Sequence, residues 1–540
     1  MLIISLVLVA ISYLSPVSFP ISLAGNFGEP RPNHFHGGLD IKTQHEEGKP
    51  IHAVADGYVC RVTVSTTGYG NAVYVRHPDG HTTVYAHLQR FEPSIQSRVK
   101  KWQYDNRSWA ADVTFQANEF PVKQGQIIAL SGNTGSSMGP HLHLEVHQSD
   151  TWDMYDPLEF LSGLVNDTKA PEARAIMIYP IEGKGVVCNS VSPQRFDWHD
   201  GLLSDTIKAW GDIGIALFAN DYMENSSNHY GIRYTTLYVD GVQVFHSDVN
   251  GIPVSQNRMV NSWGDFDYFE KHHEWFMKSF IEPGNVLACL SADKDKGILS
   301  IKEERIYSFR YLISDYFGNT SEYKWTIRGE KQTISKPQIR NDNAVALLWN
   351  KDCSIQRNGF SISIPKGNLP NTIYVTPEEK QGPFSKIYTI VNHPTPLFDM
   401  ATVSIELTSD DKSLYPKLFI ARNGKYLGGK AIAGSVVAKT KELGGAFTVL
   451  CDSLSPIIEI KDNTDNKLVV DVADTLSGIH KVAGFIDGQF ILLEPQPRTS
   501  QWYCVLSKTP VRRKRMPRSL LIEAIDQRGN KANYKTTINY

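Results

Sequence analysis

The sequence has 540 residues, of which 41% are hydrophobic and 21% charged, an ordinary composition for a globular chain of several domains. Its net charge of −2 does not favour binding to nucleic acid or to an anionic membrane. The 24 tyrosines, 23 phenylalanines and 10 tryptophans favour β-sheet structure.

Residues 2–14 are apolar and uncharged, and the stretch is too short to span a membrane. It fits the hydrophobic region of a secretory signal, with small residues for cleavage around Ala10-Ile11-Ser12. The positively charged start typical of such signals is missing, because the first basic residue is Arg31. We predict a signal peptide over 1–14 and an exported protein, with a buried strand as the alternative. No other stretch reads as a membrane span.

Three motifs between residues 33 and 145 carry the candidate chemistry: N-H-F-H-G-G-L-D, Y-A-H-L and G-P-H-L-H-L-E. The side chains that they offer are His36, Asp40, His87, His141 and His143. Polar and aliphatic residues alternate after position 140, which is the period of a β-strand, so both histidines of H-L-H point to one face. The pair Gly37-Gly38 lets the backbone turn tightly and leaves room for a ligand.

Catalytic zinc takes three protein ligands and keeps a fourth position for water. Five candidates exceed that need, and the surplus imidazoles can act as acid and base or stabilise an oxyanion. The motifs therefore predict a zinc site equipped for metal-assisted hydrolysis.

At these motifs the chain resembles the lysostaphin-type zinc endopeptidases, the LytM-like domains that cut peptide bonds in bacterial peptidoglycan. The family pattern is H-x-x-x-D, then a histidine in Y-A-H, then H-x-H, and all three occur here in that order. Three further segments also resemble sequences of this family: 50–59, 68–73 and 122–135. The resemblance covers roughly residues 24–162.

The resemblance implies an antiparallel β-sheet domain built on the duplicated hybrid motif. It implies one Zn²⁺ ion, bound by His36, Asp40 and His143. It also implies a catalytic pair, His87 and His141. In our assignment His141 activates the water and His87 serves the oxyanion or the leaving amine, although the two roles can be exchanged.

Two further residues, Glu145 and Asn33, are expected to orient the ligands through hydrogen bonds. The remaining histidines near the motifs are interpreted as structural or solvated: His34, His52, His77, His81 and His147.

Short β-runs precede His87, at 51–55, 58–64, 72–76 and 82–86, and the turn at 77–80 joins the last two as a hairpin. After it, Phe91, Ile95, Val99 and Trp102 recur at helical spacing, and the helix opens near Pro93. This helix either packs over the sheet or forms a lid beside the peptide groove.

The second half of the chain contains an internal repeat. A G-I to D-G stretch occurs at 231–241 and at 478–488, and a D-x-x-G-N-x-x-x-Y stretch occurs at 315–323 and at 526–534. One β module therefore occurs twice, with a D-G turn between two strands. Both copies resemble the immunoglobulin-like sandwiches of exported bacterial proteins.

A third β segment lies between the two copies, and its F-S-I-S-I alternation predicts a strand with one buried face. Trp349 and Phe360 are expected in its core. A basic run at 511–515 is read as a solvated hairpin loop between paired strands. The six cysteines are scattered without a C-x-x-C pattern, so we expect no disulfide framework, and only a pairing of Cys451 with Cys504 is left open.

The predicted fold class is mainly β: an antiparallel β-sheet peptidase domain followed by two to three immunoglobulin-like β-sandwich domains. The predicted segments are a signal peptide at 1–14, the LytM-like zinc peptidase domain at 15–165, and β-sandwiches at 166–332, 333–455 and 456–540.

The predicted function is that of an exported zinc metalloendopeptidase that hydrolyses stem peptides or cross-links of peptidoglycan, in the periplasm or cell envelope. Peptidoglycan is the expected partner, and other envelope proteins are expected at the sandwich domains. One alternative is a catalytically silent protein of the same fold that binds peptidoglycan or activates another hydrolase. Another is a zinc peptidase that acts on proteins, because the metal chemistry is the same for any amide.

Overall fold

A computed structural model describes residues 13–199, 202–203, 206–224, 226–335, 343–409, 411–464, 466–514 and 516–540. Nearly all of the predicted signal peptide lies outside these residues. In the described part of the chain, every helix is too short or too polar to cross a lipid bilayer.

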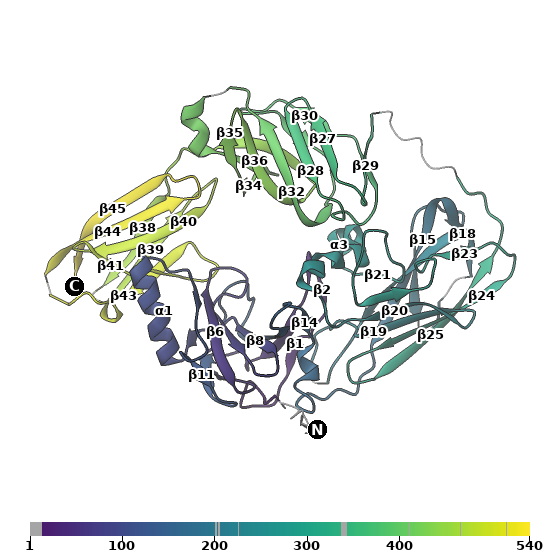
Figure 1. Cartoon of the computed structure of the whole chain (residues 1–540), viewed down its shortest axis with the longest axis horizontal. Helices are drawn as coiled ribbons and strands as arrows, with labels where there is room; N and C mark the ends of the chain where they lie inside the picture. The colour runs from purple at the N-terminus through teal and green to yellow at the C-terminus, as the bar shows by residue number, and fades with distance from the viewer. Residues whose placement is uncertain are drawn as a thin grey trace, which may run out of the picture.

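The protein is mainly β, as predicted, and its four parts follow one another around a closed path (Figure 1). The N-terminal domain comes first, and three β modules follow it: the first (172–329), the second (345–451) and the third (457–539). The third β module returns to the N-terminal domain and lies beside its helix α1 (Pro93–Asn106) (Figure 1).

The main sheet of the N-terminal domain has the strand order β1-β4-β13-β8-β7-β6-β10. In that order the strands are β1 (Leu23–Gly25), β4 (Gly38–Lys42), β13 (His141–Gln148), β8 (His81–Ala86), β7 (Ala72–Arg76), β6 (Gly57–Val64) and β10 (Ala111–Thr114). The hairpin predicted at 77–80 is confirmed, because β7 pairs with β8 in antiparallel register. Leu142, Leu144 and Val146 of β13 point into the core. Their alternation leaves the histidines of the same strand on the other face.

The helix predicted from Pro93 is confirmed as α1, and the Glu92 side chain caps its N-terminus. Ile95 and Val99 pack into the core of the N-terminal domain. The outer face meets the third β module, where the rings of Tyr104 and Phe490 lie 5.6 Å apart. The helix is therefore held between two packed regions.

The first β module forms one continuous sheet of strands around a common core, rather than two separate sheets. This occurs because β18 (Ile207–Asn220) is long enough to pair along β15 (Glu172–Val187) and also with shorter strands and β25 (Thr320–Gly329). The remaining strands are β16 (Gln194–His199), β17 (Leu202–Leu203), β19 (Tyr234–Val239), β20 (Val242–Asp248), β21 (Met277–Lys278), β22 (Leu290–Ala292), β23 (Leu299–Ile301) and β24 (Ile306–Ser314).

The second β module has two sheets that share one hydrophobic core. One sheet contains β27 (Cys353–Arg357), β28 (Phe360–Ile364), β32 (Pro396–Glu406), β36 (Ser435–Glu442) and β35 (Lys430–Ile432). The other contains β30 (Glu378–Lys380), β31 (Ile387–Thr389), β37 (Ala446–Cys451), β33 (Leu418–Arg422) and β34 (Lys425–Gly428). The predicted strand in F-S-I-S-I is confirmed as β28, and Phe360 lies in the core with Trp349 packed against it.

The third β module also has two sheets around one core. One contains β38 (Ile457–Thr464), β39 (Lys467–Ala473), β43 (Gln501–Val505) and β42 (Glu494–Pro495). The other contains β41 (Gln489–Ile491), β40 (Ile479–Ile486), β44 (Pro517–Asp526) and β45 (Lys531–Asn539). The hairpin predicted around the basic run is wrong, because β43 and β44 belong to different sheets.

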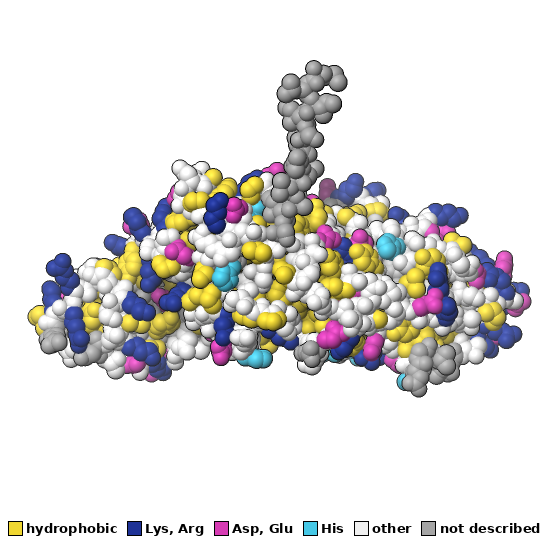
Figure 2. All heavy atoms as spheres, turned by 90° about the horizontal axis from the view of Figure 1, so that it is seen from below, with side chains coloured by type: hydrophobic (Ala, Val, Ile, Leu, Met, Phe, Trp, Pro, Cys, Tyr) yellow, Lys and Arg dark blue, Asp and Glu magenta, His cyan; other side chains and the backbone are white. Residues whose placement is uncertain are grey.

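The repeat identified in the sequence has the same local structure in both copies. A D-G turn joins β19 to β20 and β40 to β41, and the backbone φ is positive at both turn residues: 49° and 81° at Asp240 and Gly241, 46° and 79° at Asp487 and Gly488. These values are typical of the tight turn that D-G favours. All six cysteines lie in the described part and are free thiols, so Cys451 and Cys504 are not paired. Figure 2 shows acidic and basic side chains interspersed over one face of the molecule.

Candidate metal and catalytic site

Strand pairing brings the three motifs together. In β13, His143 lies directly opposite Asp40 of β4 on one side and opposite Ala86 of β8 on the other. His87 is the next residue after β8, and His36 comes two residues before β4 begins. Motifs that are far apart in the sequence therefore converge on one face of the sheet.

His36, Asp40 and His143 form a compact cluster of ligand atoms. Asp40 Oδ1 lies 3.0 Å from His36 Nε2 and 2.8 Å from His143 Nδ1, and the two ring nitrogens are 3.1 Å apart. All three residues are buried. Two imidazole nitrogens and one carboxylate oxygen are a donor set that fits a single Zn²⁺ ion and leaves one position for water.

In each metal-facing imidazole, the ring nitrogen that points away from the cluster makes a hydrogen bond that orients the ring. His36 Nδ1 donates a hydrogen bond to the backbone oxygen of Asn26 at 2.5 Å, which leaves Nε2 for the metal. His143 Nε2 lies 2.8 Å from Glu145 Oε1, which leaves Nδ1 for the metal. Such contacts fix the tautomer and the ring orientation of a metal ligand.

Glu145 lies at the centre of a buried chain of hydrogen bonds. Its Oε2 is 2.6 Å from His147 Nε2 and accepts from the Tyr69 hydroxyl at 2.7 Å. Burial opposes ionisation of Glu145, but the bonds from His143 and His147 hold its pKa well below the ordinary value. The motifs do not indicate Tyr69, and His147 is predicted to be structural or solvated, although H-x-H-x-E-x-H places His147 on the face of the ligands.

Asp40 is stabilised as a carboxylate. Burial alone would raise its pKa, but the neighbouring imidazoles of His36, His141 and His143 hold it far below the ordinary range. Its second oxygen accepts from Arg31 at 2.9 Å, and Arg31 also pairs with Glu29. The motif pattern did not indicate Arg31, because it lies before the first motif.

The two remaining imidazoles lie beside the cluster. The rings of His87 and His141 are 4.7 Å apart. His87 Nδ1 donates to the backbone oxygen of Thr134 at 2.9 Å, and His141 Nδ1 donates to that of Gly139 at 2.8 Å. Both rings therefore present Nε2 to the site, and His141 Nε2 lies 3.3 Å from Asp40 Oδ1.

His87 has a left-handed backbone with φ of 58°. Its amide is held by the backbone oxygen of Tyr69, which secures this uncommon conformation. Burial, followed by the neighbouring His143 and His141, lowers the pKa of His87 to about 3. At neutral pH His87 is therefore uncharged.

Two expectations are corrected by the geometry. The space at Gly37 and Gly38 serves packing rather than a ligand, because a Cβ there would lie 2.7 Å from Glu145 Oε1 and 2.1 Å from the Leu144 oxygen respectively. Asn33 does not support a ligand, because its amide and side chain pair with Asn261 of the first β module.

The third β module also reaches this site. Arg498 donates to the backbone oxygen of Ser137 and, at 3.0 Å, to Asn133 Oδ1. The Ser137 hydroxyl lies 3.2 Å from His141 Nδ1. The loop that carries His141 is therefore tied to the far end of the chain.

Residues 34–104, which include two of the three motifs, match the profile of peptidase family M23. The N-terminal domain is a peptidase domain of family M23. Within this M23 domain, the matched segment holds His36, Asp40 and His87. A second profile, described as a Zu5-like domain, matches residues 344–452, which include the second β module.

Several known proteins resemble this chain over about a quarter of its length or less. A metalloprotease of Haemophilus influenzae is 39% identical over 112 residues, which are 21% of this chain and 18% of that protein. A peptidoglycan DD-endopeptidase of Vibrio cholerae is 30% identical over 135 residues, 24% of this chain and 26% of that protein. The crystal structure of a zinc-containing peptidase from Vibrio cholerae is 28% identical, with a TM-score of 0.19, and covers 25% of this chain and 36% of that one. The chain thus spans about a quarter or less of the curated relatives.

Proposed function

We propose that this chain is an exported zinc metalloendopeptidase that hydrolyses peptide bonds in the stem peptides or cross-links of peptidoglycan. One observation carries the proposal: His36, Asp40 and His143 converge on one point, and the two spare imidazoles lie beside it. A structural cluster of histidines would not need acid/base groups with their Nδ1 atoms already committed to backbone oxygens.

Zinc in such a site supplies Lewis acidity, making water nucleophilic near neutral pH and polarising a scissile carbonyl. His141 accepts the proton of the attacking water, because its Nε2 faces the cluster and is unprotonated in the tautomer set by Gly139. His87 serves the oxyanion or the leaving amine. Since both rings have the same tautomer, these roles can be exchanged. Acid/base help of this kind contributes about 100- to 10,000-fold.

The choice of substrate rests on the relatives. The Vibrio cholerae relative, 30% identical over 135 residues, bears the description peptidoglycan DD-endopeptidase. A cell-wall substrate places this chain in the periplasm or cell envelope, with peptidoglycan as its main partner. The β modules supply surfaces for other envelope proteins.

The test is digestion of purified sacculi by the zinc-loaded full chain, with His141→Ala in parallel. We expect new soluble peptides from the wild type only, and their masses identify the bond that is cut. Binding to sacculi with no released peptide would favour the catalytically silent alternative. Cleavage of a protein such as casein, with intact sacculi, would favour a protein substrate.

A further inference from the structure

A second group of ligand-type side chains lies where the M23 domain meets the first β module. We call it the acidic cluster, and it consists of Asp167, Asp221 and Asp315. Asp167 follows the M23 domain, Asp221 comes directly after β18, and Asp315 comes directly after β24. One carboxylate oxygen from each residue lies within 4.8 Å of the other two.

The acidic cluster is buried and only partly compensated: Asp167 Oδ1 accepts from the backbone amide of Lys169 at 3.1 Å, and Asp315 accepts from Asn319. The exposed fractions are 7% for Asp167, 1% for Asp221 and 2% for Asp315. Asp167 Oδ2 and Asp221 Oδ1 are buried without a hydrogen-bond partner. Among the described residues, no lysine or arginine side chain is a leading influence on the pKa of Asp167 or Asp221. Buried carboxylates are normally paired or bound to a metal, because the lost hydration is otherwise not replaced.

The pKa values of the cluster also reflect the lack of positive charge around it. Burial is the main reason why the pKa of Asp167 is raised to about 7 and that of Asp221 to about 8, and neighbouring carboxylates add to both effects. One of those neighbours is Glu224, a partly exposed residue whose carboxylate accepts from the backbone and hydroxyl of Thr168. Glu224 therefore lies at the solvent-facing rim of the cluster.

We propose that the acidic cluster, completed by Glu224, binds one Ca²⁺ ion. The available donors are all oxygen atoms, which suits Ca²⁺ and Mg²⁺ rather than a metal that prefers nitrogen or sulfur. Ca²⁺ takes six to eight oxygens in irregular geometry, whereas Mg²⁺ requires a nearly ideal octahedron. Carboxylates supplied by separate loops and a solvent-facing rim match the first requirement.

Asn319 orients the cluster from outside. Its amide donates to Asp315 Oδ1 at 2.8 Å, and its side chain donates to Asp315 Oδ2 at 2.7 Å and to the Asp167 backbone oxygen at 3.1 Å. These bonds use one lone pair on each Asp315 oxygen and leave others for a cation. Asp315 and Asn319 are the aspartate and the asparagine of the repeated D-x-x-G-N motif.

The other copy of the repeat provides an internal comparison. Asn530 makes the same bonds to Asp526 and to the backbone oxygen of Asp452. There, however, none of the three carboxylates has a buried oxygen without a hydrogen-bond partner. Asp452 accepts from the amides of Leu454 and Ser477. The third carboxylate, Asp474, is half-exposed and accepts from the amides of Leu476 and Gly478. Since its charges are already compensated, we infer no cation there.

The position of the acidic cluster connects it to the M23 site. Asp221 and Tyr230 exchange backbone hydrogen bonds at 3.0 Å, and Tyr230 donates its hydroxyl to the backbone oxygen of Leu23 at 2.9 Å. The next residue, Gly231, donates to the Asn26 side chain at 2.8 Å. The backbone oxygen of Asn26 is the partner of the metal ligand His36. A cation at Asp221 would thus fix the segment that supports His36.

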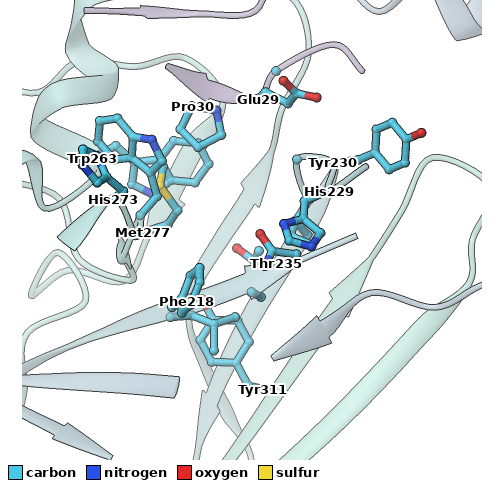
Figure 3. Close-up of a pocket in the computed structure, with 17 residues that line it drawn as sticks. Glu29, Pro30, Phe218, His229, Tyr230, Thr235, Trp263, His273, Met277 and Tyr311 are labelled. Carbon is cyan, nitrogen blue, oxygen red and sulfur yellow. The ribbon is translucent and has the colours of Figure 1, made fainter. Parts of the chain in front are cut away.

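Figure 3 shows the same segment from its other side, where His229 and Tyr230 line a cavity of about 190 Å³. Glu29 and Pro30 of the M23 domain lie at its upper edge, and Phe218, at the end of β18, lies below (Figure 3). The segment after Asp221 therefore has this cavity on one side, while Tyr230 packs into the core of the M23 domain.

The test measures Ca²⁺ binding to the full chain, with its zinc content determined in the same samples. The variants are Asp221→Asn, which removes one charge from the acidic cluster, and Asp474→Asn, which makes the same change in the other copy. We expect one Ca²⁺ per wild-type chain, at least tenfold weaker binding by Asp221→Asn, and unchanged binding by Asp474→Asn. Absence of binding to the wild type, or equal binding by Asp221→Asn, would overturn the proposal. Calcium binding does not require peptidase activity. The calcium measurement can therefore be interpreted even if the proposed peptidase function fails its own test.

Thermal unfolding provides a second readout that guards against misfolding of the variant. Without Ca²⁺, Asp221→Asn should unfold at a higher temperature than the wild type, because burying a neutral amide costs less than burying a carboxyl group that is ionised in the unfolded chain. With CaCl₂ at a hundred times its dissociation constant, the wild-type midpoint should rise by roughly 5 to 10 °C and the order should reverse. If the same protein has the higher unfolding temperature with and without Ca²⁺, the cluster is only structural.

Discussion

Asp40 and Asp221 are both buried carboxylates, but their surroundings are opposite. Asp40 is flanked by three imidazoles and Arg31, so its pKa is held far below the ordinary value. Asp221 faces other carboxylates and lacks a basic partner in the described part of the chain, so its pKa is raised to about 8. The first environment suits a metal that accepts nitrogen ligands, and the second suits an oxygen-binding cation.

The largest expected effect is the loss of the M23 metal. Replacing Asp40 or His36 by alanine removes one of three ligands and should abolish zinc binding, with peptidase activity falling by at least about 100- to 10,000-fold. Zinc content and sacculus digestion check this. His34→Ala is the matched control, because His34 is an exposed neighbour whose side chain lies 3.0 Å from the Pro32 backbone oxygen. Zinc retained by both ligand variants would contradict the assignment.

His141→Ala should separate chemistry from metal binding. We expect zinc content equal to that of the wild type and a rate about 100- to 10,000-fold lower, since the ring supplies acid/base help without being a ligand. Single-turnover rates on a purified cell-wall peptide measure the loss. Loss of zinc in this variant would mean that His141 is itself a ligand.

Much of this site follows from the sequence for clear reasons. Alternation in H-L-H predicts a strand, and an antiparallel partner for that strand puts His143 opposite Asp40. Local spacing cannot identify contacts made by distant segments. Arg498 of the third β module donates to the backbone oxygen of Ser137, and the Asn261 side chain donates to that of Asn33. Both contacts depend on how modules pack, which strand periodicity does not encode.

The fold shows the same division. The D-G turns of the repeat are determined by local backbone preferences, and both occur where predicted. The pairing partner of a strand is not local, so the strands around the basic run were assigned to one hairpin although they lie in two sheets. The acidic cluster was invisible for a similar reason. Its D-x-x-G-N motif was recognised as a repeat, but Asp167 and Asp221 lie far from Asp315 in the sequence.

Glu145→Gln should weaken zinc binding by about 10- to 100-fold, the usual effect of removing a ligand's supporting partner. The amide keeps the shape of the carboxylate but loses the charge that orients His143 and His147. Competition with a zinc-binding dye measures the affinity. An unchanged dissociation constant would show that the charge of Glu145 does not tune the ligand.

The stability of the calcium-free protein should depend on pH through Asp221. Its folded pKa of about 8 lies above the ordinary value of 3.8, so its stabilising contribution is complete below about pH 4 and is lost as pH rises through 8. Each pKa unit corresponds to about 1.4 kcal/mol. Unfolding midpoints between pH 5 and 9 should fall more steeply for the wild type than for Asp221→Asn. Parallel curves would argue against the raised pKa.

The smallest expected effect concerns the contact between the third β module and the M23 site. Arg498→Ala removes an exposed contact from the loop that carries His141, so kcat/KM should fall by up to about fivefold with zinc content unchanged. Lys508→Ala, an exposed change in the same module, is the control. A rise in activity would instead show that this module restrains the site.

The most direct test of the contrast between the two sites is elemental analysis of the full chain after equilibration with both zinc and calcium. We predict one zinc and one calcium in the wild type, calcium without zinc in Asp40→Ala, and zinc without calcium in Asp221→Asn. Loss of both metals in either variant, or calcium that remains in Asp221→Asn, would contradict the account that surrounding charge assigns each metal to its own site.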